Sequence, residues 1–261
     1  MDAIVLAGGM LKEDDPLYEQ TGVEKKALIP LLGQPMIDWV LDAIRGSGLV
    51  ENIAVVGLTA HDLDDDDQRL FYVDMTGGIV DNAFAGLHKL QAVNPSVKKI
   101  LVFSSDIPLI TPKIVRGFVE ECGSQEADMY YAVVEENTME ASFPDSKRTF
   151  VPFKGGRYSG GDALLVDVDA ATGNTELARS LTGSRKNYIK QARFIGLSFI
   201  IRFLFRLMTV NEAAERAAEK GNLKGKVVLT RFPELGMDVD KFHQYELIKS
   251  YLEKRQAQET T

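Results

Sequence analysis

The chain has 261 residues, which is more than most compact domains but within the reach of one α/β domain. Hydrophobic residues make up 45% of it and charged residues 26%, a balance that excludes a disordered or collagen-like chain. A formal net charge of −8 argues against a surface built to bind nucleic acid. The single cysteine, Cys122, has no internal disulfide partner, and the first residues lack the pattern of a signal peptide. We therefore expect a cytoplasmic protein without a nucleic-acid partner.

Short apolar and β-branched runs alternate with stretches of helical period along the chain. Strands are predicted for residues 3–6, 53–58, 99–103, 129–134, 163–166 and 226–229. Helices are predicted for residues 36–44, 79–90, 112–122 and 210–220. Continuous apolar strands that alternate with helices are typical of a mostly parallel sheet covered on both faces. The sequence thus predicts one domain over residues 1–261, a three-layer α/β/α sandwich with a Rossmann-like sheet.

The first predicted strand ends in small residues, Leu6-Ala7-Gly8-Gly9, and a polar loop then leads to Lys25-Lys26. Glycine has no Cβ, so backbone N–H groups can approach a ligand closely there. Such amides form a concavity suited to the phosphates of a nucleotide, and a lysine beyond the loop would add positive charge. An ordinary strand-to-loop turn is the alternative, and the dinucleotide fingerprint Gly-x-Gly-x-x-Gly is absent.

The acidic run Asp64-Asp65-Asp66-Asp67 is the most conspicuous block of charge in the sequence. Consecutive aspartates on an extended chain point in alternating directions and repel one another. We therefore favour a solvated loop between two strands over a metal site.

A second acid, Asp106, follows the predicted strand 99–103 in the sequence Ser105-Asp106-Ile107-Pro108. Open α/β sheets bind their ligands at the carboxyl ends of their strands, where this carboxylate is expected. Pro108 restricts the residue before it to an extended conformation, which helps to fix the loop. Magnesium prefers hard oxygen ligands, so Asp106 is a candidate metal ligand. A helix-capping role is less attractive, because Thr111 is better placed for it.

Residues 194–210 are mostly apolar, but Arg202 and Arg206 interrupt them. A bilayer-spanning helix needs about 20 apolar residues, so this segment is not expected to cross a membrane. We favour a helix buried against the sheet or in a subunit interface, as in a homo-oligomer. Peripheral contact with anionic lipid is the alternative, because basic residues precede the segment: Lys186, Lys190 and Arg193.

Two further acids, Asp238 and Asp240, lie near the C-terminus in Gly236-Met237-Asp238-Val239-Asp240. Side chains two apart on an extended chain project from the same side. Two such carboxylates repel unless a cation or ordered amides share their charge, so the pair is a candidate metal site with Asp106. Capping of a helix predicted over 242–252 is the rival interpretation.

Taken together, three motifs resemble the sugar-phosphate nucleotidyltransferase superfamily, and within it the molybdenum-cofactor guanylyltransferase-like (MobA-like) NTP transferases. They are Leu6-Ala7-Gly8-Gly9, the stretch from Lys26 to Ile37, and Ser105-Asp106-Ile107-Pro108-Leu109-Ile110. The matches run in order from residue 3 to about 120 and return at 238–248. The resemblance implies the nucleotide-diphospho-sugar transferase fold and the transfer of a nucleotidyl group from an NTP to a phosphorylated small-molecule acceptor, with release of pyrophosphate.

The resemblance also implies roles for individual residues. It places the nucleotide against Leu6, Ala7, Gly8 and Gly9 and gives Lys26 contact with its phosphates. Asp106 would bind Mg²⁺, with Asp238 and Asp240 supplying the second acid. The turn at Gly77 and Gly78 would close over the nucleoside, with Asn82 bonding to it or serving only in the helix entry.

The acceptor is implied to face Gly161 and Asp162, for which a tight turn before a strand is the alternative. Residues 185–225 would form a helical insertion on the acceptor side or in an interface.

One departure concerns the family's usual Gly-x-Gly-x-Arg, because Met10-Leu11-Lys12 follows Gly9 here. Lys12 or Lys25 would replace the arginine as a point charge only, since lysine lacks the planar fork. The alternatives to a nucleotidyltransferase are a glycosyltransferase that uses a nucleotide sugar and a non-catalytic nucleotide-binding module.

Overall fold

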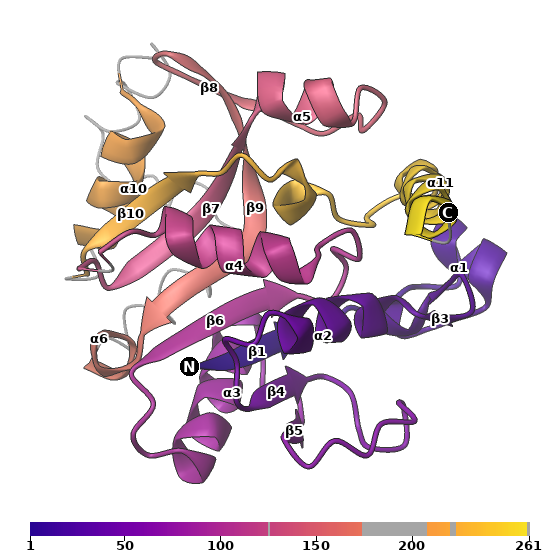
Figure 1. Ribbon diagram of the computed structural model, residues 1–261, viewed down its shortest axis with the longest axis horizontal. Coiled ribbons are helices and arrows are strands. Elements are labelled where there is room, and N and C mark those ends of the chain that lie inside the picture. Colours follow the sequence, from indigo (N-terminus) through magenta and orange to yellow (C-terminus); the bar gives the residue numbers. More distant parts are fainter. Residues whose placement is uncertain (125, 174–207, 220–222, 260–261) are drawn as a thin grey trace.

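The computed structural model describes residues 1–124, 126–173, 208–219 and 223–259 (Figure 1). Its strands are β1 (Asp2–Leu6), β2 (Pro30–Leu31), β3 (Gln34–Pro35), β4 (Ile53–Val56), β5 (Leu70–Val73), β6 (Lys99–Ser104), β7 (Met129–Glu135), β8 (Val151–Phe153), β9 (Gly156–Asp167) and β10 (Gly225–Leu229). Its helices are α1 (Pro16–Thr21), α2 (Met36–Gly46), α3 (Ile79–Val93), α4 (Pro112–Glu121), α5 (Glu136–Ser142), α6 (Val168–Gly173), α10 (Val210–Glu219) and α11 (Phe242–Glu259). Two short 3₁₀ turns, η1 (Lys26–Leu28) and η2 (Pro233–Gly236), complete the described elements.

The main sheet has the strand order β10-β7-β9-β6-β1-β4-β5, and β8 pairs with β9. Strand β1 runs parallel to β4 and β6, β4 runs parallel to β5, and β7 runs parallel to β10. The long strand β9 is antiparallel to both of its neighbours, β6 and β7. The prediction of a mostly parallel sheet is therefore confirmed, with β9 and β8 as its antiparallel part.

Apolar side chains alternate between the two faces of the central strands and meet a helical layer on each side. Ala3 and Val5 of β1 share a buried cluster with residues of α2 and α4. Ile4, between them, packs in a second cluster with residues of α3 and α6. Figure 1 shows α2 and α4 crossing one face of the sheet, with α3 behind β1 and β4. This arrangement confirms the predicted three-layer sandwich.

A third buried cluster lies beyond the carboxyl ends of the strands, where α11 lies beside α1 (Figure 1). Leu17 of α1 and Ile248 and Leu252 of α11 are all fully or almost fully buried there. Met237 and Val239, from the segment just before α11, belong to the same cluster. The C-terminal helix is thereby anchored next to the carboxyl-end edge of the sheet.

The parallel register brings several strand ends to one place. Leu6 lies opposite Val56 in β4 and opposite Ser104 in β6, so the turns after all three strands share one edge. Gly57, in the turn after β4, has φ +109°, a conformation that favours glycine. A Cβ at this position would lie 2.6 Å from the α-carbon of Gly8. The close approach of these two turns therefore depends on Gly57.

The predicted strands and helices all occur, and most of their ends agree within three residues, but β9 begins seven residues before the predicted strand 163–166 and α11 ends seven residues after the predicted helix 242–252. The alternative given for Gly161 and Asp162 is wrong: these residues and Gly160 do not form a tight turn before a strand but lie inside β9. Glycine is unfavourable in strands, so sequence reasoning placed a turn there. The packing explains it, because a Cβ on Gly160 would lie 2.2 Å from the Tyr131 hydroxyl oxygen.

Most of the predicted insertion at 185–225 lies outside the described residues, as does the apolar segment 194–210 apart from its last three positions. Within 210–220 the predicted helix is present as α10, which packs on β10. Among the helices of the described ranges, none is long and apolar enough to cross a bilayer. Cys122 is buried at the end of α4, and burial raises the pKa of its thiol to about 12.

We expect Gly57→Ala to lower the free energy of unfolding more than Gly48→Ala does. Both glycines have positive φ; alanine costs about 1–2 kcal/mol of backbone strain in the left-handed region, where Gly48 (φ +70°) lies, and at least as much at Gly57 (φ +109°). Gly48 has open space around its missing Cβ, whereas Gly57 faces the backbone of Gly8, so only the variant at 57 adds a steric cost. Urea denaturation measures both values, and equal losses would contradict the close approach of the two turns.

Candidate functional site

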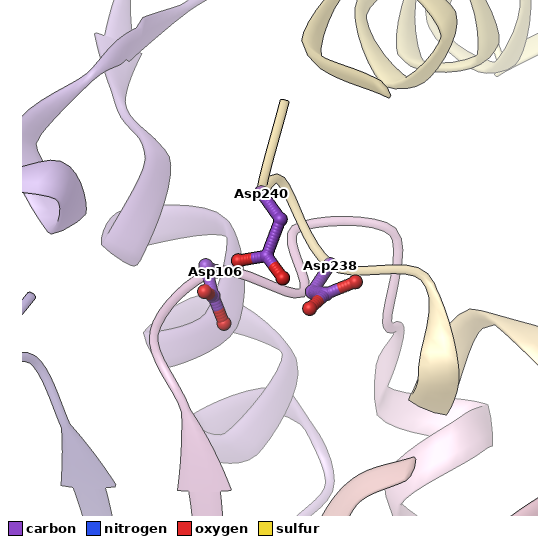
Figure 2. A group of neighbouring side chains, drawn as sticks. All are labelled: Asp106, Asp238 and Asp240. Carbon is purple, nitrogen blue, oxygen red and sulfur yellow. The ribbon is translucent and has the colours of Figure 1, made fainter. Parts of the chain in front are cut away.

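Three carboxylates from distant parts of the chain meet at the carboxyl-end edge of the sheet. Asp106 follows β6, and Asp238 and Asp240 lie between η2 and α11. One carboxylate oxygen of each lies within 4.8 Å of those of the other two. Figure 2 shows the three side chains facing a common point, with Asp240 reaching down from the segment that leads into α11. We call this group the acid cluster. The predicted proximity of residues 106 and 238–240 is thus present in the structure.

The two C-terminal acids alternate with buried apolar residues along the chain. Met237 and Val239 are fully buried in the core, so Asp238 and Asp240 project from the opposite side. The Val239 N–H also donates to the backbone carbonyl of Asp106 at 2.9 Å, which ties the two segments together.

The rival interpretation, in which these acids cap α11, is not supported by the hydrogen bonds of the described residues, because the carboxylates of Asp240 and Asp238 pair with Lys26 and Arg148. Gln244, in the first turn of α11, accepts hydrogen bonds from the N–H groups of Asp240 and Lys241 just before the helix, at 3.0 and 2.9 Å. In contrast, Thr111 does cap α4, by accepting from the Ile114 N–H at 3.3 Å, as expected from the sequence. The carboxylates of Asp238 and Asp240 are consequently available to the acid cluster.

Lys26 connects the acid cluster to the glycine turn after β1. Its Nζ lies 2.6 Å from Asp106 Oδ2 and 2.6 Å from Asp240 Oδ1. Its backbone N–H donates to the Gly9 carbonyl at 2.9 Å. Burial by itself would lower the pKa of Lys26, but the ion pairs with Asp106 and then Asp240 outweigh it and raise this pKa. The ammonium therefore stays charged between the two acids.

Arg148 is a second cation of this site, and the sequence analysis did not find it. Its guanidinium pairs with Asp238, and only 12% of each side chain is exposed. Arg148 Nη2 also donates to Gly160 O at 3.3 Å and to Ser159 Oγ at 3.4 Å, both in β9. The surrounding sequence, Ser146-Lys147-Arg148-Thr149, is polar and shows no apolar period, so it gives no signal of a buried arginine.

Ser104 was also missed, although it stands two residues before Asp106. Its hydroxyl donates to Asp106 Oδ1, the oxygen that does not contact Lys26. Both oxygens of this carboxylate are thus oriented by the protein.

The glycine turn after β1 lies beside the turn that precedes α3. A Cβ on Gly8 would lie 2.4 Å from the sulfur of Met75, whose side chain is 47% exposed. Asn82 is buried, and its Oδ1 accepts from the N–H groups of Thr76 and Gly77 at 2.9 and 3.3 Å. This asparagine therefore holds the turn at Gly77 and Gly78, and its amide nitrogen faces the Gly8 side. The predicted nucleotide-contacting residues Leu6, Ala7, Gly8 and Gly9 border this edge of the sheet together with that turn.

Asp162 of β9 lies next to the acid cluster, because Ala163 pairs with Phe103 at the end of β6. Burial raises the pKa of Asp162 from 3.8 to about 7, the nearby charge of Asp106 adds to the increase, and Arg148 opposes it. Gly161 packs tightly, since a Cβ there would lie 3.0–3.1 Å from Ala132 and from the Leu235 carbonyl. Of the two residues predicted to face an acceptor, Asp162 therefore borders the cluster on its β9 side, whereas Gly161 is buried against Ala132 and Leu235.

The acidic run at 64–67 forms a loop between β4 and β5, as favoured from the sequence. Asp65 and Asp67 pair with Arg45 at 2.6 and 3.2 Å, while Asp64 and Asp66 are exposed. Within the described residues, the acid cluster is the one group of three or more metal-ligating side chains close enough to share an ion.

Of the two lysines considered as replacements for the family's arginine, Lys25 is already paired. Its Nζ lies 2.6 Å from Asp62 Oδ1, and hydrogen bonding to Lys25 is the main reason that the pKa of Asp62 falls to about 2. Lys12 is exposed, in the loop that leads from Gly9 to α1.

The donor set of the acid cluster suits a divalent cation. Carboxylate oxygens are the ligands that Mg²⁺ prefers, and three of them meet here. A positive charge already sits between two of them, in the form of the Lys26 ammonium. Asp240, with 60% of its side chain exposed, leaves the cluster open to an ion from solvent.

We expect the stability of the metal-free protein to depend on Asp162 and on pH. With its pKa raised to about 7, folded Asp162 holds a proton that the unfolded chain loses near pH 4, so its contribution to stability falls as the pH rises from 4 to 7. Asp162→Asn lacks this titration and should gain at least about 1 kcal/mol relative to wild type between pH 5 and pH 8. Urea denaturation in EDTA at both pH values measures the difference, and a constant difference would contradict it.

Comparison with known proteins agrees with this geometry. Residues 3–184 match the family model of the MobA-like NTP transferase domain. A stretch of 110 residues is 29% identical to the bifunctional protein GlmU of Geobacter metallireducens, and it spans 39% of this chain and 22% of that relative.

Two solved structures share the fold. One is a hypothetical transferase from Thermus thermophilus, with a TM-score of 0.79 and 30% identity over 94% of this chain and 98% of that one. The other is 4-diphosphocytidyl-2C-methyl-D-erythritol synthase from Anaerococcus prevotii, with a TM-score of 0.59, 13% identity and 97% of each chain covered. The match over residues 3–184 establishes that the chain belongs to the MobA-like NTP transferase domain family, a family of nucleotidyltransferases.

Proposed function

We propose that this protein is a magnesium-dependent nucleotidyltransferase that moves an NMP group from an NTP to a phosphorylated small-molecule acceptor and releases pyrophosphate. The observation that carries the proposal is the meeting of Asp106, Asp238 and Asp240 with Lys26 beside the glycine turn. We propose the cytoplasm as its location, in keeping with its single buried thiol.

The reaction follows from the charges involved. An oxygen of the acceptor phosphate attacks the α-phosphorus of the NTP, a new P–O bond forms, and the bond to the pyrophosphate oxygen breaks. Both partners are anions, so the barrier is dominated by repulsion, and no side-chain nucleophile is needed. A Mg²⁺ ion held by the acid cluster would supply positive charge to the phosphate oxygens and help to align them.

The protein's own residues supply the rest. Backbone N–H groups at Gly8 and Gly9 have no Cβ in front of them and suit close contact with the nucleotide. Lys26, anchored to Gly9, is within reach of both the glycine turn and the acid cluster and would neutralise phosphate charge. Asn82 would contribute to nucleotide binding indirectly, because it holds the turn at Gly77 and Gly78 in place.

The acceptor would lie against Gly161 and Asp162. Asp162 borders the acid cluster from β9, so an acceptor bound there would have its phosphate close to the α-phosphorus. Protonated Asp162 donates a hydrogen bond and ionised Asp162 accepts one, and both forms are populated near neutral pH at a pKa of about 7. Hydroxyl groups of the acceptor suit either form.

We expect Asp106→Asn to fold normally and to lower kcat for pyrophosphate release at least about 100-fold, the typical cost of losing a preorganised electrostatic contact. Asparagine keeps the shape of the side chain and can still accept from Ser104, but it lacks the charge that binds a cation. The assay mixes each of four NTPs with Mg²⁺ and candidate sugar or alditol phosphates. Unchanged turnover in the variant would refute the role of Asp106.

The same assay separates the alternative functions. A glycosyltransferase would consume a nucleotide sugar and release no pyrophosphate, and a non-catalytic module would bind an NTP, as seen by thermal shift, without turnover.

We expect Lys26→Met to lower kcat/KM for the NTP at least about 100-fold, because phosphate neutralisation at the glycine turn is lost. Lys25→Met is the matched control: it removes the neighbouring ammonium, which is paired with Asp62 instead of the acid cluster. The control should stay within about threefold of wild type, because partly exposed ion pairs contribute little. Equal losses in both variants would show that general positive charge, and not the position of Lys26, is required.

A further inference from the structure

The three acids of the cluster are divided between two cations of different character. Lys26 pairs with Asp106 and Asp240, whereas Arg148 pairs with Asp238. The exposure of these side chains is uneven: Asp240 is 60% exposed, whereas Asp106, Asp238, Lys26 and Arg148 are each 12–16% exposed. The cluster is therefore open to solvent at Asp240.

Arg148 is fixed from a second direction. Its guanidinium donates to the Gly160 carbonyl and to the Ser159 hydroxyl of β9 while it contacts Asp238. In contrast, a flexible aliphatic chain connects the backbone of Lys26, which is bonded to Gly9, with the ammonium group that contacts the two acids. A guanidinium with several fixed donors is a stable partner, whereas a lysine ammonium reorients readily.

We propose that Arg148 is a positioning residue that holds Asp238 permanently, so that Asp106 and Asp240 alone carry the exchangeable cation. This inference rests on the proposed function. In the structure the exchangeable cation is the Lys26 ammonium, and in the working enzyme it is the divalent metal. Asp238 shapes the cluster through Arg148 and is not a direct metal ligand.

The charge balance supports this division. Three carboxylates opposed by Arg148 and one divalent cation are neutral, which leaves Lys26 free to turn toward the phosphates. Without Arg148, the metal and Lys26 would both be needed to balance the acids, and Lys26 would stay bound to them. A carboxylate as buried as Asp238 also has to be paired, because an unpaired buried charge is strongly destabilising.

Direct measurement of Mn²⁺ binding to the nucleotide-free protein tests the inference without relying on activity. Arg148→Gln removes the guanidinium charge and keeps a donor for the Gly160 carbonyl, so it should free Asp238 and tighten Mn²⁺ binding several-fold. Arg148→Lys keeps the charge but loses the fixed donors to β9, so its affinity for Mn²⁺ should lie between those of wild type and Arg148→Gln.

The charge-conserving double variant decides the role of Asp238. Arg148→Gln combined with Asp238→Asn removes one positive and one negative charge and leaves a neutral amide pair in their place. If Asp238 is not a ligand, the double variant binds Mn²⁺ within about threefold of wild type. A loss of tenfold or more, similar to that of Asp106→Asn, would make Asp238 a ligand and overturn the inference. Weaker binding in Arg148→Gln alone would also overturn it, since that result marks Arg148 as structural support only.

Asp106→Asn separates a failure of this inference from a failure of the proposed function. Suppose that wild type binds Mn²⁺ and that both Asp106→Asn and the double variant lose this binding. In that case only the role assigned to Arg148 is wrong. If wild type binds no Mn²⁺ with or without an NTP, the metal dependence of the proposed function fails, and the inference fails with it. Electron paramagnetic resonance of the free ion supplies the binding curves, and thermal unfolding of each variant confirms that it is folded.

Discussion

Mutual repulsion among three carboxylates is the constraint on which the rest of the site depends. Asp106, Asp238 and Asp240 have oxygens within 4.8 Å of one another, and two of these residues are largely shielded from water. Such a group is unfavourable unless cations are supplied at fixed positions. Lys26 and Arg148 supply them, and each is held by further contacts with the turn after β1 or with β9.

The residues of the site come from four separate segments of the chain. Parallel pairing of β1 with β6 aligns Leu6 with Ser104, so the glycine turn and Asp106 emerge at the same edge. The antiparallel strand β9 enters beside β6 from the opposite direction and brings Ser159, Gly160 and Asp162 to that edge. The core cluster under α11 buries Met237 and Val239 and thereby directs the alternate acids toward the site. Packing on one side of this segment thus determines which side chains face the site on the other side.

Sequence reasoning succeeded where a local pattern carries the information. Apolar runs and helical periods identified the sheet, its layers and the carboxyl-end location of Asp106, and the two-residue spacing of Asp238 and Asp240 correctly placed both on one side. It failed at Gly160 and Gly161, because only the Tyr131 hydroxyl and the Leu235 carbonyl, which are distant in sequence, explain glycines inside a strand. It missed Arg148 for the same reason: its partners lie 11, 12 and 90 positions away, and nothing in its own segment indicates burial. The convergence of residues 106 and 238–240 was inferred from the mutual repulsion of the acids and from the family resemblance, and not from any periodicity.

The departure from Gly-x-Gly-x-Arg has a physical consequence in this geometry. Lys25 is committed to Asp62, and the loop after Gly9 has no glycine or arginine and presents the exposed side chains of Met10 and Lys12. Close to the glycine turn, fixed positive charge therefore comes from Lys26, whose ammonium is shared between two carboxylates. An NTP that arrives alone would have to draw this lysine away from both acids, leaving them uncompensated. An NTP that arrives as its metal complex brings the replacement cation with it. On the proposed function, the metal–nucleotide complex is thus the form of substrate that the charges of this site accept at the lowest free-energy cost.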